Sequence, residues 1–317
     1  MLHKIILMCA LGCSLTALAQ GYPAQSIKFV VPFGAGAATD LFARLVAQHL
    51  QPLNGQLVVV DNKPGGNGAI AAEYVARAKP DGYTLMFSTA TAHASNVWLM
   101  KQLSYDPVKD FEPVTRLGTL NFVIAVPVNS PYRDTAELIS AAKAQPGKIS
   151  IATANATGTI AGHALVKWAG ADITIVPYKS SPQALTDLMG GRVSSMVADF
   201  TSGAGWLKSG KMRGLAVTGA KRSSLYPEVP TLDELGMKGF DLIGWFGLYA
   251  PTGTARGIIT LLNSKVAEVL ANPELKPQFA NLGLDVFSST PEALGAHTRA
   301  EIRNWERYVK DAGLEAQ

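Results

Sequence analysis

Short apolar runs typical of strands alternate with helix-like patterns along the first third of the chain. A β-branched run at 27–32 precedes residues 40–50, where apolar residues recur at the spacing of one helix face. A second apolar run at 57–60 precedes a helical pattern at 69–78, and a third run lies at 83–87. This strand–helix–strand–helix–strand order predicts an α/β fold, with a parallel sheet and helices packed against it.

The same alternation returns in the middle of the chain. Strands are expected at 122–126, 149–152, 173–177 and 193–197, and helices at 134–144, 163–168 and 183–189. The segments VVPFGAGAATDLFARLVAQHL and SIATANATGTIAGHALVKWAG both join a strand to a helix through a loop of small residues. This internal echo is consistent with two α/β lobes, each of which presents such a loop towards the other.

The first of these loops has the composition of an anion site. Its residues 34–39, GAGAAT, resemble the dinucleotide fingerprint G-x-G-x-x-G but lack the third glycine. The loop still leads small residues into a helix start, where unpaired N–H groups meet the positive end of the helix dipole. A carboxylate or a phosphate binds readily at such a position. The alternative interpretation is a tight turn in which Thr39 or Asp40 only caps the helix.

The first nineteen residues have the layout of a secretory signal peptide. Lys4 is followed by an apolar run and by Ala17-Leu18-Ala19, a small-x-small cleavage site. The run is shorter than the roughly 20 apolar residues that a membrane span needs. We therefore expect cleavage of residues 1–19 and export to the periplasm. Both cysteines lie in this segment, so the mature chain must rely on an ordinary core without disulfides.

Charge and motifs exclude several classes of function. The net charge is +4 and no basic run occurs, which argues against nucleic-acid binding. The chain has no G-x-S-x-G motif, and none of its histidines is spaced as in H-E-x-x-H. Residues 205–211 fit G-x-x-x-x-G-K, but Met212 stands where Ser or Thr would hold Mg²⁺. We expect no cofactor, no metal and no catalytic residue.

Several longer stretches carry a resemblance to a known family. They are YPAQSIKFVVPFGAGAATDLFARLV, NKPGGNGAIAAEYVARAKPDGYTL, LSYDPVKDFEPV, VPYKSSPQALTDLMGGRV, GKMRGLAVTGAKRS with PEVPTLDELG, and WFGLYAPTGT. In these stretches and in their order the chain resembles the Bug or TctC-like extracytoplasmic solute receptors of tripartite tricarboxylate transporters. The resemblance covers essentially the whole mature chain.

The resemblance implies a fold of the type II periplasmic-binding-protein kind, with two α/β lobes and a ligand cleft between them. Lobe 1 would comprise residues 20–123 and 247–317, and lobe 2 residues 124–246. The protein would be a monomeric receptor, not an enzyme, that captures a small organic carboxylate and delivers it to membrane permease subunits. Two alternatives are a ligand-loaded partner of a membrane sensor kinase and an exported α/β hydrolase, against which the missing nucleophile motif argues.

The resemblance also implies which residues bind the ligand. Two loops would pinch the carboxylate with N–H groups and hydroxyls, and other residues would form the distal wall. The first loop provides Gly34, Gly36, Ala37, Ala38, Thr39 and Asp40; the second provides Asn155, Thr157, Gly158 and Thr159; the wall provides Phe33, Ser88, Thr89, His93, Asp199 and Phe200. No basic residue is placed for a second carboxylate, which favours a monoacid, an amide-bearing acid or a water-bridged diacid. Ala37 replaces a family glycine and tolerates positive φ poorly, so a different loop path is expected.

Overall fold

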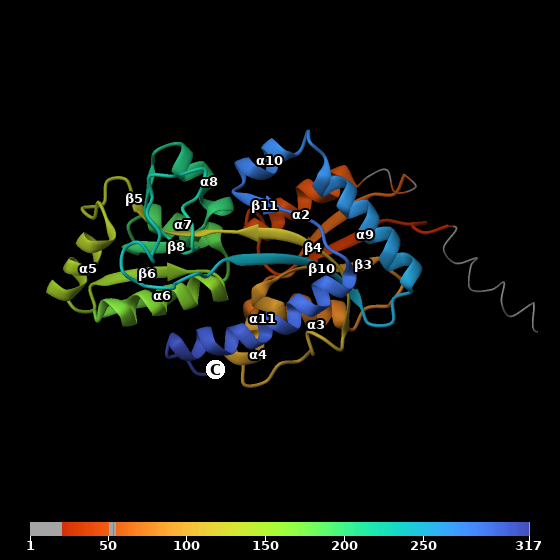
Figure 1. Ribbon diagram of the computed structural model, residues 1–317, viewed down its shortest axis with the longest axis horizontal. Helices are drawn as coiled ribbons and strands as arrows, with labels where there is room; N and C mark the ends of the chain where they lie inside the picture. The colour runs from red at the N-terminus through yellow and green to blue at the C-terminus, as the bar shows by residue number, and fades with distance from the viewer. Residues whose placement is uncertain (1–20, 51–52, 54, 317) are drawn as a thin grey trace, which may run out of the picture.

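Two β-sheets, each with its own helices, organise the chain into two lobes that lie side by side (Figure 1). The computed structural model describes residues 21–50, 53 and 55–316. The predicted signal peptide therefore lies outside the described residues. None of the helices formed by these residues combines the length and the hydrophobicity of a membrane span.

The sheet of the first lobe has six strands in the order β11-β4-β10-β3-β1-β2. These strands are β1 (Ile27–Val31), β2 (Val58–Asn62), β3 (Thr84–Thr89), β4 (Phe111–Leu120), β10 (Gly244–Pro251) and β11 (Leu284–Val286). The sheet of the second lobe has five strands in the order β7-β6-β8-β5-β9. They are β5 (Phe122–Pro127), β6 (Ile149–Thr153), β7 (Ile173–Pro177), β8 (Ser195–Asp199) and β9 (Met212–Val217).

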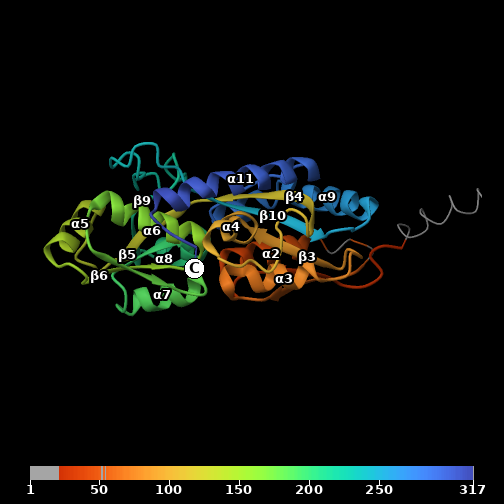
Figure 2. The ribbon, with the colours of Figure 1, turned by 90° about the horizontal axis from the view of Figure 1, so that it is seen from below.

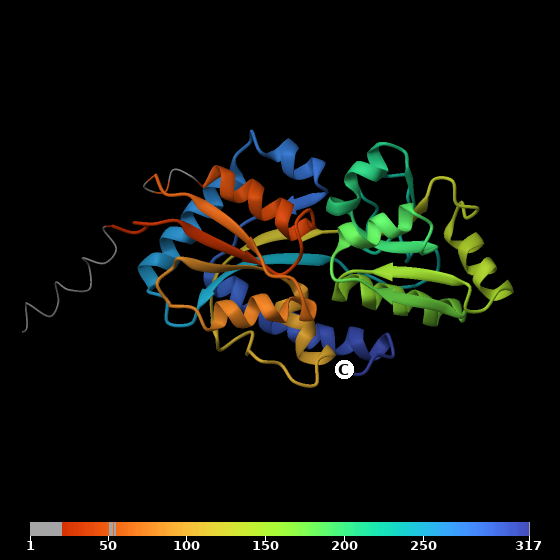
Figure 3. The same cartoon turned by 180° about the vertical axis from the view of Figure 1, so that it is seen from behind.

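The helices follow the strands in the α/β alternation that the sequence predicts. The first lobe has α2 (Ala38–His49), the short helix η1 (Gly66–Gly68), α3 (Ala69–Ala76), the π-helix η2 (Thr91–Ser95), α4 (Asn96–Leu99), α9 (Arg256–Ala271), α10 (Lys276–Asn281) and α11 (Pro291–Asp311). The second lobe has α5 (Thr135–Ala144), α6 (Ala156–Ala169), α7 (Ser181–Met189) and α8 (Phe200–Lys208). Figure 3 shows both groups from behind.

The parallel pairing predicted from the strand–helix alternation is confirmed for three strands of each sheet, and the other strands are antiparallel. Strands β2-β1-β3 and β7-β6-β8 are parallel, but β10 runs antiparallel to β3 and β4, and β5 antiparallel to β8 and β9. The antiparallel strands include β4, β5 and β10, which carry the chain from one lobe to the other. Strand β4 ends at Leu120 and β5 begins at Phe122, so the chain crosses at Asn121 and returns into β10 at Gly244. The division into lobe 1 (20–123 and 247–317) and lobe 2 (124–246) that the resemblance implies remains a prediction.

Helix α11 connects the two lobes along one side of the molecule (Figure 2). It packs on the first lobe, where Trp98 Nε1 donates a hydrogen bond to the Ile302 carbonyl at 2.6 Å. Its last turn reaches the second lobe, where Lys167 Nζ donates to the Asp311 carbonyl at 2.7 Å. The helix begins at Pro291, because the Thr290 hydroxyl accepts from Ala293 N and Pro291 occupies the first turn.

The core of the first lobe is built around Phe42 of α2. Its ring contacts three phenylalanine rings edge-on: Phe87 of β3, Phe246 of β10 and Phe279 of α10, at centroid separations of 5.2, 5.3 and 5.7 Å. Edge-to-face contacts of this kind stabilise beyond simple area burial. The cluster holds α2 against the sheet, so the loop before α2 is attached to a rigid support.

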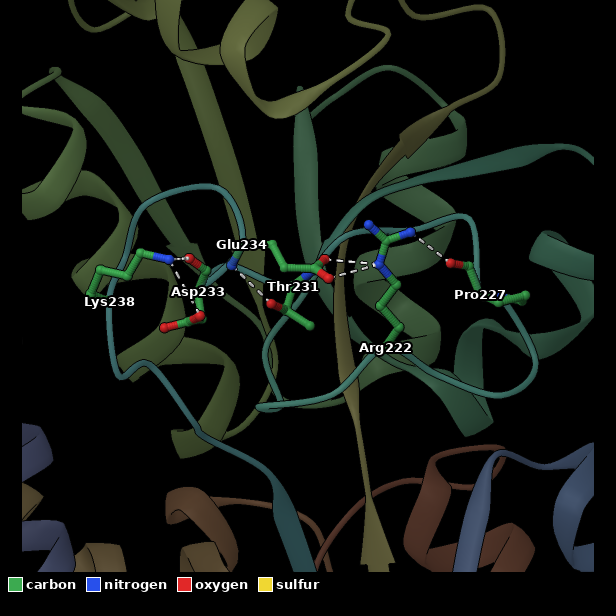
Figure 4. Close-up of polar contacts among 6 residues, drawn as sticks. All are labelled: Arg222, Pro227, Thr231, Asp233, Glu234 and Lys238. Carbon is green, nitrogen blue, oxygen red and sulfur yellow. Dashed lines mark hydrogen bonds and ion pairs between the residues drawn. The ribbon is translucent and has the colours of Figure 1, made fainter.

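A capping box orders the return segment between β9 and β10 (Figure 4). The Thr231 hydroxyl accepts from Glu234 N at 3.0 Å, and Glu234 Oε2 accepts from Thr231 N at 2.9 Å. Arg222 Nε binds both carboxylate oxygens of Glu234, and its Nη1 donates to the Pro227 carbonyl. These contacts hold the segment over β9 before the chain crosses back to the first lobe.

Candidate functional site

A narrow cleft, part of it open to solvent, lies between the lobes. The carboxyl ends of β1, β3, β6 and β8 reach it, which is where open α/β sheets bind their ligands. Its lining residues are Phe33, Ala37, Ala38, Thr39, Thr89, Ala90, Thr91, Leu120, Phe122, Ala154, Asn155, Thr157, Ser181, Asp199, Gly244, Trp245 and Phe246.

The first turn of α2 brings unpaired N–H groups to this cleft. Ala37 occupies the N-cap position and has no side-chain acceptor to offer, although a polar N-cap stabilises a helix by about 1 kcal/mol. Gly36 N donates to Asp40 Oδ2, and Ala37 N to the Gly34 carbonyl. In the described part of the chain, the N–H groups of Ala38 and Thr39 have no acceptor. The helix start therefore offers donors to an anion.

The first turn of α6 brings a second set of donors from the other lobe. Asn155 caps this helix through its Oδ1, which accepts from Gly158 N at 2.9 Å. Ala156 N donates across the cleft to Thr91 Oγ1 at 3.4 Å. The N–H and the hydroxyl of Thr157 have no partner among the residues that the structure describes. Both lobes thus contribute free donors to one cleft.

Among the described residues, Asp199 is the only charged one that lines the cleft. The residue is 2% exposed, and it caps α8 by accepting from Ser202 N through Oδ1 at 2.7 Å. Its Oδ2 accepts from the hydroxyl of Ser181, which also lines the cleft, at 2.7 Å. A carboxylate can accept about four hydrogen bonds, so Asp199 keeps capacity for a donor on the ligand.

The remaining lining is largely apolar. Aromatic rings come from Phe33 after β1, Phe122 of β5, and Trp245 and Phe246 of β10. The part of the chain that the structure describes contributes no Lys, Arg or His to the lining. The cleft can therefore surround an apolar body while it holds an anion by neutral donors.

The structure brings half of the sequence-predicted residues to the cleft. Those that line it are Phe33, Ala37, Ala38, Thr39, Thr89, Asn155, Thr157 and Asp199. Those that do not are Gly34, Gly36, Asp40, Ser88, His93, Gly158, Thr159 and Phe200. The second group lies in or next to the same loops and strand ends but does not line the cleft.

Asp40 and Thr159, two residues of this second group, are engaged in contacts within their own lobe. Asp40 binds Arg44 at 2.8 Å and also accepts from Asn62 and Gly36 N. Burial acts to raise the pKa of Asp40, but hydrogen bonds from these groups outweigh it and keep the pKa below its ordinary value. The Thr159 hydroxyl donates to the Asn155 carbonyl at 3.0 Å and also contacts Thr153 Oγ1. Neither side chain is free to hold a ligand.

Two further expectations about the loops need correction. Helix α6 begins at Ala156 and not at residue 163, because Asn155 caps it and because Gly158 fits closely against β8, where a Cβ would lie 3.3 Å from the Val197 carbonyl. Ala37 does not need positive φ. Its φ is −73°, and Gly36, at φ +80°, makes the turn instead. Gly36 faces Pro182 of the other lobe, where a Cβ would lie 3.5 Å from Pro182 Cγ.

His93 lies in the core of the first lobe, fully buried behind the cleft. Its Nδ1 is 2.6 Å from Ser88 Oγ, and its ring stacks on Tyr249 with centroids 3.8 Å apart. Burial lowers the pKa of His93 to about 3, so the ring is neutral at ordinary pH. The side chain is a packed core group and not a cleft cation.

Sequence reasoning missed nine lining residues. They are Ala90, Thr91, Leu120, Phe122, Ala154, Ser181, Gly244, Trp245 and Phe246. Ser181 had a local signal, since Pro182 marks a helix start after a strand. Leu120 and Trp245 had none, because they reach the cleft only through the pairing of β4 with β10.

Comparison with known proteins gives a consistent family assignment. A family model described as "Tripartite tricarboxylate transporter family receptor" matches residues 42–314. Protein BugT of Bordetella pertussis is 34% identical over 313 residues, covering 97% of this chain and 95% of BugT. A UPF0065 protein from the tcbD–tcbE intergenic region of a Pseudomonas species is 34% identical over 298 residues, covering 93% and 88%.

Solved structures agree with this assignment. Rpa4515 of R. palustris, solved with adipate, has a TM-score of 0.90 and 35% identity, covering 93% of this chain and all of that one. The periplasmic binding protein BugD has a TM-score of 0.89 and 35% identity, with the same coverage. MatC of Rhodopseudomonas palustris, with bound malate, has a TM-score of 0.84 and 30% identity, covering 91% and 100%.

Proposed function

Because this chain belongs to the tripartite tricarboxylate transporter receptor family, we propose that it captures a small organic carboxylate in the periplasm for a transporter of that type. Its solved relatives include proteins bound to adipate and to malate, which are both carboxylates. The chain binds its ligand without chemical turnover, as a receptor and not as an enzyme.

The observation that carries the proposal is the meeting of two helix starts in one cleft. Ala38 and Thr39 of one lobe and Thr157 of the other present donors that no described residue uses. N–H groups at a helix start stabilise a negative charge without a cationic side chain. A carboxylate that bridges α2 and α6 would link the lobes, so binding and closure are coupled.

The proposal includes partners and a location. The acid would pass to membrane permease subunits, and the receptor would act as a monomer. Cleavage of residues 1–19 would release the mature chain at Gln20. The lobes would divide as 20–123 with 247–317, and 124–246. The mature N-terminus from the periplasmic fraction tests the cleavage, since intact Met1 or a lipid on Cys13 would contradict it.

A thermal-shift screen against small carboxylates tests the function itself. An acid present at 100 times its Kd should stabilise the fold by about 2.7 kcal/mol. The matched control for each responding acid is its primary amide, which has a similar shape but no charge. We expect acids to stabilise the protein and their amides to have little effect. Equal stabilisation by acids and amides, or no response to any acid, would contradict the proposal.

A further inference from the structure

Helix α8 of the second lobe contacts the end of α10 in the first lobe, outside the cleft (Figure 1). The Thr201 hydroxyl donates a hydrogen bond to the Leu282 carbonyl at 2.7 Å. Lys208 Nζ donates to the carbonyl and to the side-chain oxygen of Asn281, at 3.2 and 3.0 Å. The last carbonyls of a helix receive no hydrogen bond from within that helix, so side chains of the second lobe cap α10 of the first.

Gly283, which follows α10, lets the two lobes approach closely at this contact. It has φ +69°, and an added Cβ would lie 2.8 Å from Phe200 Cβ and 3.7 Å from a methyl group of Leu225. A side chain at this position would therefore force the lobes apart. Thr201 is only 3% exposed, so the contact is packed as closely as a core.

Each side of the contact is attached to a rigid part of its own lobe. Helix α10 is held in the first lobe by Phe279, whose ring packs edge-on against Phe42. Helix α8 begins directly after the cleft residue Asp199, which caps it by accepting from Ser202 N. A rotation of the lobes that opens the cleft therefore moves α8 relative to α10.

The contact extends away from the point where the chain crosses between the lobes. Phe200 N donates to the carbonyl of the crossing residue, Asn121, at 3.2 Å. Thr201 comes next, whereas Lys208 ends the helix, about 10 Å farther along by the rise of an α-helix. A rotation about the crossing displaces distant points most, so the Lys208 end should separate first.

We infer that Thr201, Lys208, Asn281, Leu282 and Gly283 form a latch that is made when the lobes close and broken when they open. The inference rests on the proposed function, in which closure accompanies capture of a carboxylate. Thr201 and Lys208 are positioning residues, because they do not line the cleft but stabilise its closed arrangement. Such a latch slows the release of every bound acid by the same factor and leaves the rate of capture unchanged.

Thr201→Val and Lys208→Met remove the donors and keep most of the side-chain shape. The probe is the acid with the largest shift in the thermal screen. By calorimetry, Thr201→Val should weaken its binding about three- to tenfold, and Lys208→Met, whose contact is exposed, about twofold. Thr186→Val is the matched control, because the exposed Thr186 hydroxyl donates to the Pro182 carbonyl within the second lobe and should not affect affinity.

Stopped-flow measurements separate a latch from a merely structural contact. In the double variant Thr201→Val/Lys208→Met, dissociation of the acid should be faster and association unchanged. The affinity ratio between this acid and a second, weaker one should stay the same. Wild-type affinity in the double variant would overturn the inference, as would a loss that arises from slower association alone.

Small-angle X-ray scattering tests the latch without any acid. The double variant should have a larger radius of gyration than the wild type, because its closed arrangement is less stable. If the whole carboxylate screen is silent, the proposed function fails, and the scattering alone decides the inference. Equal radii of gyration would then overturn it.

Discussion

Trp245 Nε1 donates a hydrogen bond to Glu301 Oε2 over 3.1 Å, which joins a wall of the cleft to the C-terminal helix α11. The indole also contacts His297 of α11 edge-on, with ring centroids 4.9 Å apart. Two residues one helical turn apart on α11 therefore fix the position of this ring. Ligand affinity should accordingly depend on a side chain that does not line the cleft.

Glu301→Leu tests this dependence. The change leaves the buried Trp245 N–H without its acceptor, which costs about 1–3 kcal/mol, and allows the ring to shift. We expect affinity for the best acid from the screen to fall about three- to tenfold, measured by calorimetry. Glu301→Gln keeps an acceptor oxygen and should retain most of the affinity. Equal affinity of the Leu variant and the wild type would show that the ring is held by packing alone.

Thr157→Val and Thr159→Val form a matched pair two residues apart. Thr157 lines the cleft with a free hydroxyl, whereas the Thr159 hydroxyl already donates to the Asn155 carbonyl. A hydrogen bond to a charged group contributes about 1.5–3 kcal/mol, so Thr157→Val should weaken acid binding by about one to two decades. Thr159→Val should change affinity less than threefold. Calorimetry on both variants measures these changes in affinity. A larger loss in Thr159→Val than in Thr157→Val would contradict the placement of the carboxylate at Thr157.

Gly36→Val should weaken ligand binding because it changes the backbone conformation of the loop before α2. Gly36 has φ +80°, which a β-branched residue adopts only with strain, so the loop before α2 must change its path. Gly210 is the control, because it has φ +67° and no neighbour within 4 Å of an added Cβ. Both Val variants should lose about 1–2 kcal/mol of stability in urea unfolding. Only Gly36→Val should lose ligand affinity, and a similar loss in Gly210→Val would refute the local explanation.

Stability should rise with pH between about 3 and 6.5. Burial lowers the pKa of His93 to about 3, so over this range the unfolded chain binds a proton that the folded chain does not. Burial and the charge of Arg116 lower the pKa of His297 to about 4, with the same sign. Each group adds at most about 1.4 kcal/mol per pH unit, and its contribution is complete above pH 6.5.

Urea unfolding of His93→Gln between pH 5 and 7 measures the share of His93. We expect a shallower rise of the unfolding free energy with pH than in the wild type, because Gln does not titrate. His297→Gln should also reduce the slope, and the double variant should reduce it further. A wild-type curve that is flat over this range would contradict the burial of neutral histidines.

Local pattern was enough to predict the parallel strands and the small-residue loops, because periodicity and turn composition are short-range signals. Local pattern failed where the start of a helix or the pairing of distant strands decides which residues line the cleft. The sequence analysis expected both Thr157 and Thr159 to contact the ligand, but in a helix that starts at Ala156 only Thr157 lines the cleft. Trp245 reaches the cleft because β10 pairs with β4, more than 100 residues away. No local feature of WFGLYAPTGT indicates that contact.

The central claim is that a carboxylate is held by the starts of α2 and α6. A crystal structure of the complex with the tightest acid from the screen tests it most directly. We expect carboxylate oxygens within about 2.7–3.2 Å of the backbone nitrogen of Ala38 or Thr39 and of the nitrogen or hydroxyl of Thr157. A carboxylate found instead on the side chains of Lys221 and Arg222, in the groove behind the crossing at Asn121, would contradict the claim.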